Sequence, residues 1–144
     1  MSGKRSVDAK KITDFAKKFV GVPYKYGATM KEAPKFFDCS SFVKYVFGHF
    51  GVELPRSTIE QAEFLKKTVK TKRGLKIGDL LYLHGTRGYY TKKFPQGIGH
   101  VVMYIGNGKV IHAGGSGRKA GVKIGILFKV IKKGKPLVVI KRVI

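Results

Sequence analysis

The sequence predicts an α+β fold, with helices in the first half of the chain and an antiparallel sheet in the second. Up to about residue 66, apolar side chains recur at the spacing of amphipathic helices. Beyond residue 78, apolar residues form short runs separated by glycine-containing turns, which is the pattern of strands. A chain of 144 residues is long enough for one core but short for two. We therefore expect a single domain over residues 1–144, with the helices packed on one sheet.

Three helices are expected before the sheet, over residues 7–20, 39–50 and 58–66. The first ends before Pro23, because proline cannot continue the hydrogen-bond ladder of a helix. The second has Asp38 as a favourable N-cap and Gly51 as a stop. Ser57 and Glu60 predict a capping box at the start of the third.

The expected strands are short and follow one another closely, over residues 80–83, 101–105, 109–113, 122–124, 126–131 and 137–143. The first is apolar on both faces, so we expect it near the centre of the sheet. Asn107 and Gly108 mark a hairpin between the second and the third. The basic stretch over residues 66–76 is expected to be a connector without a strand.

The formal net charge of +22 is the abnormal feature of the composition, and lysines are scattered along the whole chain. Such a charge favours attraction to a polyanion: nucleic acid, an anionic membrane or an anionic cell-wall polymer. A solvated surface tuned for solubility explains it equally well, and a steep loss of binding in salt would separate the two interpretations. No zinc-finger spacing, RNA-binding signature or phosphate loop accompanies the charge, so we expect no specific nucleic-acid binding.

Membrane and export signals are not evident in the sequence. No run approaches the roughly 20 apolar residues needed to span a bilayer, so we expect no transmembrane segment. Residues 1–6 are expected to form a flexible basic end. No apolar stretch follows them as it would in a signal peptide, so either the protein works inside a cell or its leader is absent from this chain.

Cys39, the only cysteine, falls where the second helix is expected to begin. In the first helical turn, unpaired backbone N–H groups and the helix dipole favour a thiolate over a thiol. Such a sulfur is a nucleophile near neutral pH. The alternative is that Cys39 is a small core residue, since free cysteine is among the most buried residue types.

A cysteine nucleophile needs a base, and four histidines are available. His49 lies on the cysteine helix but faces away from the thiol, and His84 ends the first strand and is a reserve candidate. His100 begins the second strand and His112 lies near the end of the third. The hairpin between these two strands therefore decides whether they meet.

A two-residue loop over residues 107–108 would place these two histidines on opposite faces of the hairpin. A three-residue loop over residues 106–108, built on a type I turn, would pair Ile105 with Lys109 and make the histidines diagonal neighbours on one face. Their backbones would then be roughly 7–8 Å apart. We predict the three-residue loop, with the cysteine helix packed against the face that carries both histidines.

These residues predict a thiol acyl-transfer enzyme. His100 would take the proton of Cys39 and later give it to the leaving amine. His112 would bond the far nitrogen of His100 and fix its tautomer. The backbone N–H of Cys39 and the Tyr24 hydroxyl would stabilise the oxyanion. Zinc is the competing use of cysteine and histidine, but it prefers three or four ligands at short spacings, so we expect no metal and no cofactor.

Several segments of the chain resemble the NlpC/P60 family of bacterial cell-wall cysteine peptidases, which has a papain-like fold. They stand in family order at Gly21–Gly27, Asp38–Val43, Leu54–Ser57, Gly78–Leu80 and Gly99–Ala113. The cysteine and histidine segments together are the specific part of this match. The resemblance implies N-terminal helices packed on an antiparallel, partly barrel-like sheet.

The resemblance also implies roles for single residues. The nucleophile falls on Cys39, the base on His100, the orienting residue on His112 and the assisting hydroxyl on Tyr24. Substrate-binding residues are expected beside them, at Asp38, Ser40, Ser41, Arg56 and Gly99. Two residues that stand where the family commonly has glycine are expected to narrow the space beside the thiol, namely Ser41 and Ala28.

The implied activity is hydrolysis of an amide bond in peptidoglycan stem peptides, typically the bond that follows D-glutamate, by a monomer. The implied location is outside the cell or at the cell wall, where anionic polymer would attract the charged surface, while a cytoplasmic location stays open. Two alternatives also stay open: a related thiol hydrolase or acyltransferase acting on another amide or on a lipid, and a non-catalytic cationic module that binds polyanions. Thiol alkylation would abolish hydrolysis and leave polyanion binding intact.

Overall fold

The computed structural model describes residues 8–85, 88–115, 117–132 and 135–144. The expected flexible end, residues 1–6, lies outside the described residues. The helices are α1 (Ala9–Lys17), α2 (Cys39–His49), α3 (Thr58–Phe64) and α4 (Leu127–Val130), with single turns of 3₁₀ helix at Met30–Glu32, Lys72–Gly74 and Gly117–Lys119. The strands are β1 (Lys67–Val69), β2 (Leu80–Leu83), β3 (His100–Gly106), β4 (Lys109–Gly114), β5 (Gly121–Ile126) and β6 (Leu137–Arg142).

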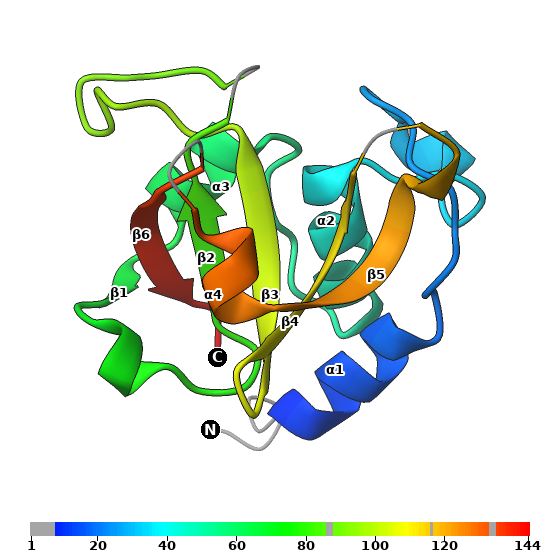
Figure 1. Cartoon of the computed structure of the whole chain (residues 1–144), viewed down its shortest axis with the longest axis horizontal. Coiled ribbons are helices and arrows are strands. Elements are labelled where there is room, and N and C mark those ends of the chain that lie inside the picture. The colour runs from blue at the N-terminus through cyan, green and yellow to red at the C-terminus, as the bar shows by residue number, and fades with distance from the viewer. Residues whose placement is uncertain (1–7, 86–87, 116, 133–134) are drawn as a thin grey trace.

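The strands form one antiparallel sheet in the order β1-β6-β2-β3-β4-β5 (Figure 1). This confirms the predicted α+β class. The sheet ends at β1 on one side and at β5 on the other, so it is open and not a closed barrel. The first predicted strand, β2, is buried along its whole length near the middle of the sheet, as its two apolar faces indicated.

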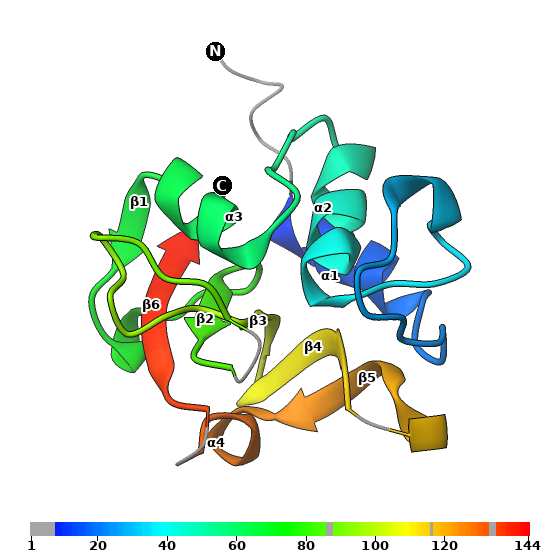
Figure 2. The same cartoon turned by 90° about the horizontal axis from the view of Figure 1, so that it is seen from above.

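Helices cover both faces of the sheet, with α1, α2 and α3 on one face and the short α4 on the other (Figure 2). The main core lies between the three helices and the sheet and includes Phe42, Phe47, Tyr82 and Met103. A smaller cluster on the α4 face includes Leu81 and Leu83 of β2 and one residue from each of three other strands: Val102, Val110 and Ile140. Because side chains alternate along a strand, these two clusters identify the face on which each sheet residue lies.

Polar side chains cap the helix starts: Ser57 at α3, as predicted, and Asp8 at α1, which was not predicted. The Asp8 carboxylate accepts a hydrogen bond from Lys10 N at 2.9 Å at the start of α1. At α3, the Ser57 hydroxyl accepts one from Glu60 N at 3.3 Å and donates one to the Glu60 carboxylate at 2.8 Å. These side chains satisfy N–H groups that have no partner inside the helix.

Two predicted elements are wrong. Residues 126–131 were expected to be a strand, but β5 ends at Ile126 and one turn of helix, α4, follows it. Residues 67–69, expected within a basic connector, form β1 and pair with β6. An edge strand pairs on one side only and through its backbone, so it needs no apolar alternation to form.

The hairpin between β3 and β4 has a different turn from the predicted one but the predicted register beyond it. Asn107 and Gly108 both have positive φ, 53° and 71°, which is a two-residue type I′ turn. It pairs Gly106 with Lys109, so the predicted three-residue type I loop is wrong. A bulge then shifts the register, because Gly106 also has a positive φ of 93°.

After the bulge, Tyr104 pairs with Val110 and Met103 with Ile111. Continuing this register sets His112 beside Val102, which is the relation that the three-residue loop was expected to produce. One extra residue in β3 therefore restores the common face of the two histidines.

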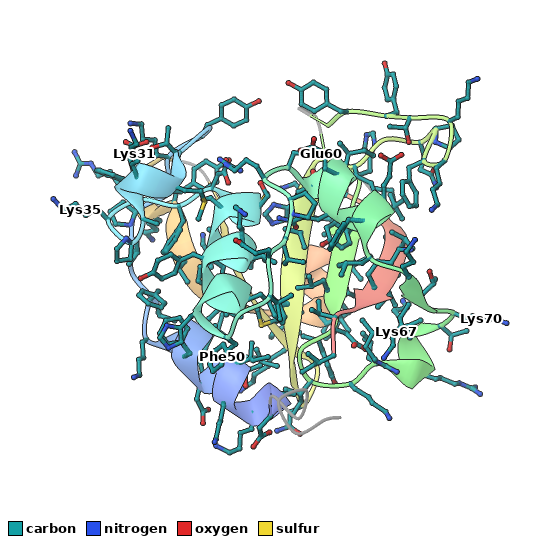
Figure 3. All side chains as sticks on the ribbon, turned by 180° about the vertical axis from the view of Figure 1, so that it is seen from behind. Lys31, Lys35, Phe50, Glu60, Lys67 and Lys70 are labelled. Atoms are coloured by element: carbon teal, nitrogen blue, oxygen red, sulfur yellow. The ribbon has the colours of Figure 1, made fainter. Side chains whose placement is uncertain are left out.

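Basic side chains are spread over the surface. Figure 3 shows Lys31 and Lys35 on one side of the molecule and Lys67 and Lys70 on the other. None of the helices in the described part of the chain is both long and apolar enough to cross a bilayer.

A buried ion pair joins the start of β2 to the end of β6. The Asp79 carboxylate, 2% exposed, accepts hydrogen bonds from Arg142 Nε at 2.8 Å and Nη2 at 2.7 Å. It also accepts one from Lys76 N at 2.9 Å. The Asp79 carboxylate thus fixes both the turn before β2 and the neighbouring strand.

Replacing Asp79 by asparagine should lower the free energy of unfolding by about 2 kcal/mol, because the half-buried guanidinium of Arg142 loses its countercharge. Urea denaturation measures this change. Asp14→Asn is the matched control, since it removes an exposed pair with Lys10 and should leave stability nearly unchanged. Equal effects of the two substitutions would show that the Asp79 pair does not hold the sheet.

Candidate active site

Cys39 is the first residue of α2, and a reciprocal cap fixes this helix start. The Asp38 carboxylate accepts a hydrogen bond from Ser41 N at 2.8 Å. In return, the Ser41 hydroxyl accepts one from Asp38 N at 2.9 Å. Both residues are buried, so the cap that fixes the backbone before and after Cys39 is shielded from water.

The thiol lies against the backbone where β3 begins. Cys39 is 8% exposed, and its Sγ is 4.0 Å from the carbonyl oxygen of Gly99, the residue before His100. The backbone N–H of Val101, the residue after His100, favours the thiolate. The sulfur therefore lies next to the backbone on either side of His100. Within the described residues, its hydrogen-bond partner is the Gly99 carbonyl oxygen and not the imidazole of His100.

Burial dominates the electrostatics of the thiol. It raises the pKa of Cys39 to about 12, and the nearby Asp38 carboxylate adds to the increase. The N–H groups of Val101 and Ser40 and the charge of Arg56 act in the opposite direction but are weaker. The expectation that the helix start makes Cys39 a thiolate is therefore wrong for the protein without substrate, because desolvation of the charge costs more than the dipole supplies.

The two imidazoles form a hydrogen-bonded pair. His100 Nε2 is 2.9 Å from His112 Nδ1, and the ring planes are 81° apart. Burial lowers the pKa of His100 to about 3 and that of His112 to about 4, so both rings are neutral at pH 7. When His100 Nε2 donates this bond, His100 Nδ1 carries a lone pair and can accept a proton.

Gly114 makes room for the pair. A Cβ at this position would lie 3.0 Å from His112 Nδ1 and 3.1 Å from His100 Cε1. Any side chain would thus press on both partners of the hydrogen bond. The sequence suggested no role for Gly114, because a glycine-rich loop usually indicates only a turn.

The histidine pair was expected on the face of the sheet on which α2 packs, but it lies on the opposite face. His100 and His112 share parity with Val102 and Val110, which belong to the α4-side cluster. A Cβ on Gly125 would be 3.7 Å from His112 Nε2 and 3.2 Å from Val130 of α4, which agrees with this placement. The thiol instead meets β3 beside its backbone, near the end of the sheet where His100 begins the strand.

Two neighbouring hollows contain the thiol and the histidine. One, about 170 Å³, is lined by Cys39, Asp38, Ser40, Arg56, Ser57, Thr58, Tyr89 and Gly27. The other, about 560 Å³, is lined by His100, Gly85, Ala120, Lys135 and the glycines at 114, 115 and 117. Tyr24, Tyr26 and Gly99 line both hollows and so join them into one cleft.

Arg56 connects the residues around the thiol. Its guanidinium donates to the Asp38 carboxylate at 2.7 Å, to the Ser40 hydroxyl at 2.8 Å and to the Ala28 carbonyl oxygen. Its side chain is 35% exposed, so part of the cation faces the cleft. The structure thus brings Asp38, Ser40 and Arg56 together beside Cys39.

Ser41 and Ala28 were expected to narrow the space beside the thiol. Neither of them lines either hollow. Both are fully buried. The Ser41 hydroxyl belongs to the cap of α2, and the Ala28 carbonyl oxygen accepts a bond from Arg56. Ser41, expected among the substrate-binding residues, belongs to the cap at the start of α2.

The other two histidines, His49 and His84, are not among the described residues that line the cleft. His49 is exposed and stacks on Phe15 of α1, with ring centroids 3.9 Å apart. His84 Nδ1 lies 2.8 Å from the Gln96 carbonyl oxygen. No group of three or more histidine, cysteine, aspartate or glutamate side chains suited to a metal occurs among the described residues.

The chain matches known proteins in sequence. Residues 21–129 match the NlpC/P60 family. The probable endopeptidase p60 of Listeria innocua is 36% identical over 104 residues, which are 72% of this chain and 19% of that protein. The murein DD-endopeptidase MepS/murein LD-carboxypeptidase of Escherichia coli K12 is 40% identical over 112 residues, 76% of this chain and 52% of that one. The chain thus spans about half the length of MepS and about a fifth of p60.

Solved structures show the same fold. The NlpC/p60 domain of the peptidoglycan hydrolase SagA matches with a TM-score of 0.68 and 29% identity, covering 92% of this chain and 98% of that one. RipD of Mycobacterium tuberculosis, described as a non-catalytic NlpC/p60 domain protein adapted to peptidoglycan binding, has a TM-score of 0.68 at 20% identity and covers 95% and 98% of the two chains. The family match, the curated relatives and the fold agree, and the chain belongs to the NlpC/P60 family.

Proposed function

We propose that this protein is a cysteine endopeptidase that hydrolyses an amide bond in peptidoglycan stem peptides. Cys39 is the nucleophile, His100 the general base and acid, and His112 the positioning residue. The observation that carries the proposal is the 2.9 Å hydrogen bond between His100 and His112, next to a thiol at the first turn of α2. Membership of a family that includes named endopeptidases supports it.

The chemistry follows from the neutral state of the resting groups. The thiol proton moves to His100 Nδ1 as Sγ forms a bond to the carbonyl carbon. The Cys39 backbone N–H and the Tyr24 hydroxyl stabilise the oxyanion. Collapse breaks the C–N bond, and His100 gives its proton to the leaving amine. Water, activated by the same imidazole, then hydrolyses the thioester and restores the thiol.

Substrate has to bring the sulfur and the imidazole together, because Sγ contacts Gly99 in the free protein. Catalytic hydrogen bonds are often long in free enzymes and shorten in the substrate complex. A neutral thiol and a neutral imidazole also avoid the cost of two buried charges until the carbonyl group arrives. His112 prepares the reaction by keeping the proton of His100 on Nε2.

The bond that we propose is the one between D-glutamate and the diamino acid that follows it. The free carboxylate of the D-glutamyl residue would be attracted by the exposed part of Arg56, beside Cys39. The name of MepS specifies DD-endopeptidase and LD-carboxypeptidase activities, which concern other bonds. We further propose that the protein acts at the cell wall, where its charge of +22 would concentrate it on anionic polymer.

Digestion of purified walls and of synthetic stem peptides, followed by mass analysis, tests the activity. The wild type should release fragments cut after D-glutamate, and Cys39→Ala should release none while unfolding at the same urea concentration. Wall binding without cleavage by the wild type would instead indicate a non-catalytic role like that described for RipD. Cleavage of other amides or of lipids alone would indicate a different thiol hydrolase.

His100→Ala should reduce kcat/KM by about 10³-fold or more, whereas His112→Ala should reduce it by about 10–100-fold. The difference is expected because His100 exchanges the proton and His112 only orients the ring that does so. Steady-state kinetics on one stem peptide compares the two variants. A larger loss for His112→Ala would reverse the two assignments.

Alkylation of the thiol should be slow at pH 7 and should rise about tenfold for each pH unit up to pH 10, because only the thiolate reacts and the pKa of Cys39 is about 12. The rate of iodoacetamide labelling, followed by mass spectrometry, gives the profile directly because the chain has one cysteine. Cys39→Ser controls for labelling elsewhere. A plateau below pH 8 would mean that a thiolate–imidazolium pair already exists in the free protein.

A further inference from the structure

The larger hollow is lined by a cation, and no carboxylate among the described residues lines it. Lys135, in the turn before β6, lines it together with His100 and the glycines after β4. No aspartate, glutamate or arginine is among the described residues of this lining. Of the ion pairs in the described part of the chain, none involves Lys135.

A second ammonium group, that of Lys123, lies next to Gly115 in the lining of the same hollow. Lys123 of β5 pairs with His112 across the β4–β5 ladder. A Cβ built on Gly115, which lines the hollow, would lie 2.5 Å from Lys123 Nζ. Lys123 has no ion-pair partner among the described residues either.

The field of these cations reaches the histidine pair. After burial, which is the largest cause, the charge of Lys135 contributes to the lowered pKa of both His100 and His112, and that of Lys123 to the lowered pKa of His112. An anion bound in the hollow would offset this unfavourable potential. The hollow is therefore electrostatically suited to a negative group.

This hollow would receive the leaving group in the proposed reaction. In the proposed reaction, the acyl part of the substrate becomes attached to Cys39 and occupies the smaller hollow with Arg56. His100 must reach the departing amine to protonate it, and His100 lines the larger hollow. The amino acid that is released thus occupies the space next to Lys135.

We propose that Lys135 recognises a carboxylate on the amino acid released by the cut, with Lys123 adding to the positive potential. This inference rests on the proposed function and specifies its substrate class: stem peptides whose diamino acid carries such a carboxylate. Lys135 lies outside residues 21–129, the part of the chain that matches the family. Diaminopimelate has one more carboxylate than lysine and is the stronger candidate.

Three synthetic peptides test the proposal, L-Ala-γ-D-Glu linked to meso-diaminopimelate, to L-lysine or to L-lysine amide. Lys135→Gln should lower kcat/KM about tenfold on a peptide whose released amino acid has the recognised carboxylate, the size expected for losing a hydrogen bond to a charged group. The L-lysine amide peptide, which lacks any carboxylate on its leaving group, should be cut at an unchanged rate. Lys135→Arg should retain most of the activity because it keeps the charge.

The pattern of loss identifies the carboxylate. A loss on both the diaminopimelate and the lysine peptides assigns the α-carboxylate, and a loss on diaminopimelate alone assigns the carboxylate at the far end of its side chain. Lys17→Gln is the matched control, because Lys17 is exposed on α1, away from the cleft residues. An equal loss on all three peptides, or no loss, would overturn the role of Lys135. Failure of the wild type to cut any peptide would overturn the proposed function itself.

Discussion

The reciprocal cap between Asp38 and Ser41 is the constraint on which the site depends. It fixes the first turn of α2 and so decides where the sulfur lies relative to β3. The Arg56 guanidinium donates to the same carboxylate, to the Ser40 hydroxyl and to the Ala28 carbonyl oxygen, so three separate parts of the chain meet at this guanidinium. Asp38 also raises the pKa of the neighbouring thiol. The residue that fixes the position of Cys39 therefore also disfavours its thiolate form.

The balance between burial and the helix dipole then determines the resting chemistry. A dipole at a helix start contributes roughly 0.3–1 kcal/mol to a nearby charge. Removing a thiolate or an imidazolium from water costs several kcal/mol. In this cleft the second effect is larger, so the sulfur and both imidazoles stay neutral until a polar carbonyl group and a developing oxyanion enter. The neutral state also keeps His112 Nδ1 able to accept the hydrogen bond that orients His100.

The sequence predicted what depends on local signals and missed what depends on tertiary contacts. Caps and apolar spacing identified α2, α3 and the central strand β2 correctly. The edge strand β1 and the helical turn α4 were missed, because pairing with β6 and packing on the sheet decide them. At the site, the meeting of His100 and His112 was predicted from a three-residue loop that the structure does not have, and the bulge beside Gly106 produces the same relation between the two strands. Gly114 and Lys135 could not be found, because nothing in a glycine-rich loop or a lysine-rich segment distinguishes one residue from its neighbours.

The bulge at Gly106 has a consequence for how this hairpin can vary. Successive side chains along a strand point to opposite faces of the sheet. The two-residue turn alone would place the two imidazoles on opposite faces, and the one-residue bulge returns them to the same face. One residue inserted into β3 or β4 between the turn and a histidine would turn that ring to the opposite side of an otherwise intact sheet, whereas one added at the tip of the turn would leave the pairing unchanged. The strand segments on either side of the turn are thus under a length constraint that the stability of the fold alone would not impose.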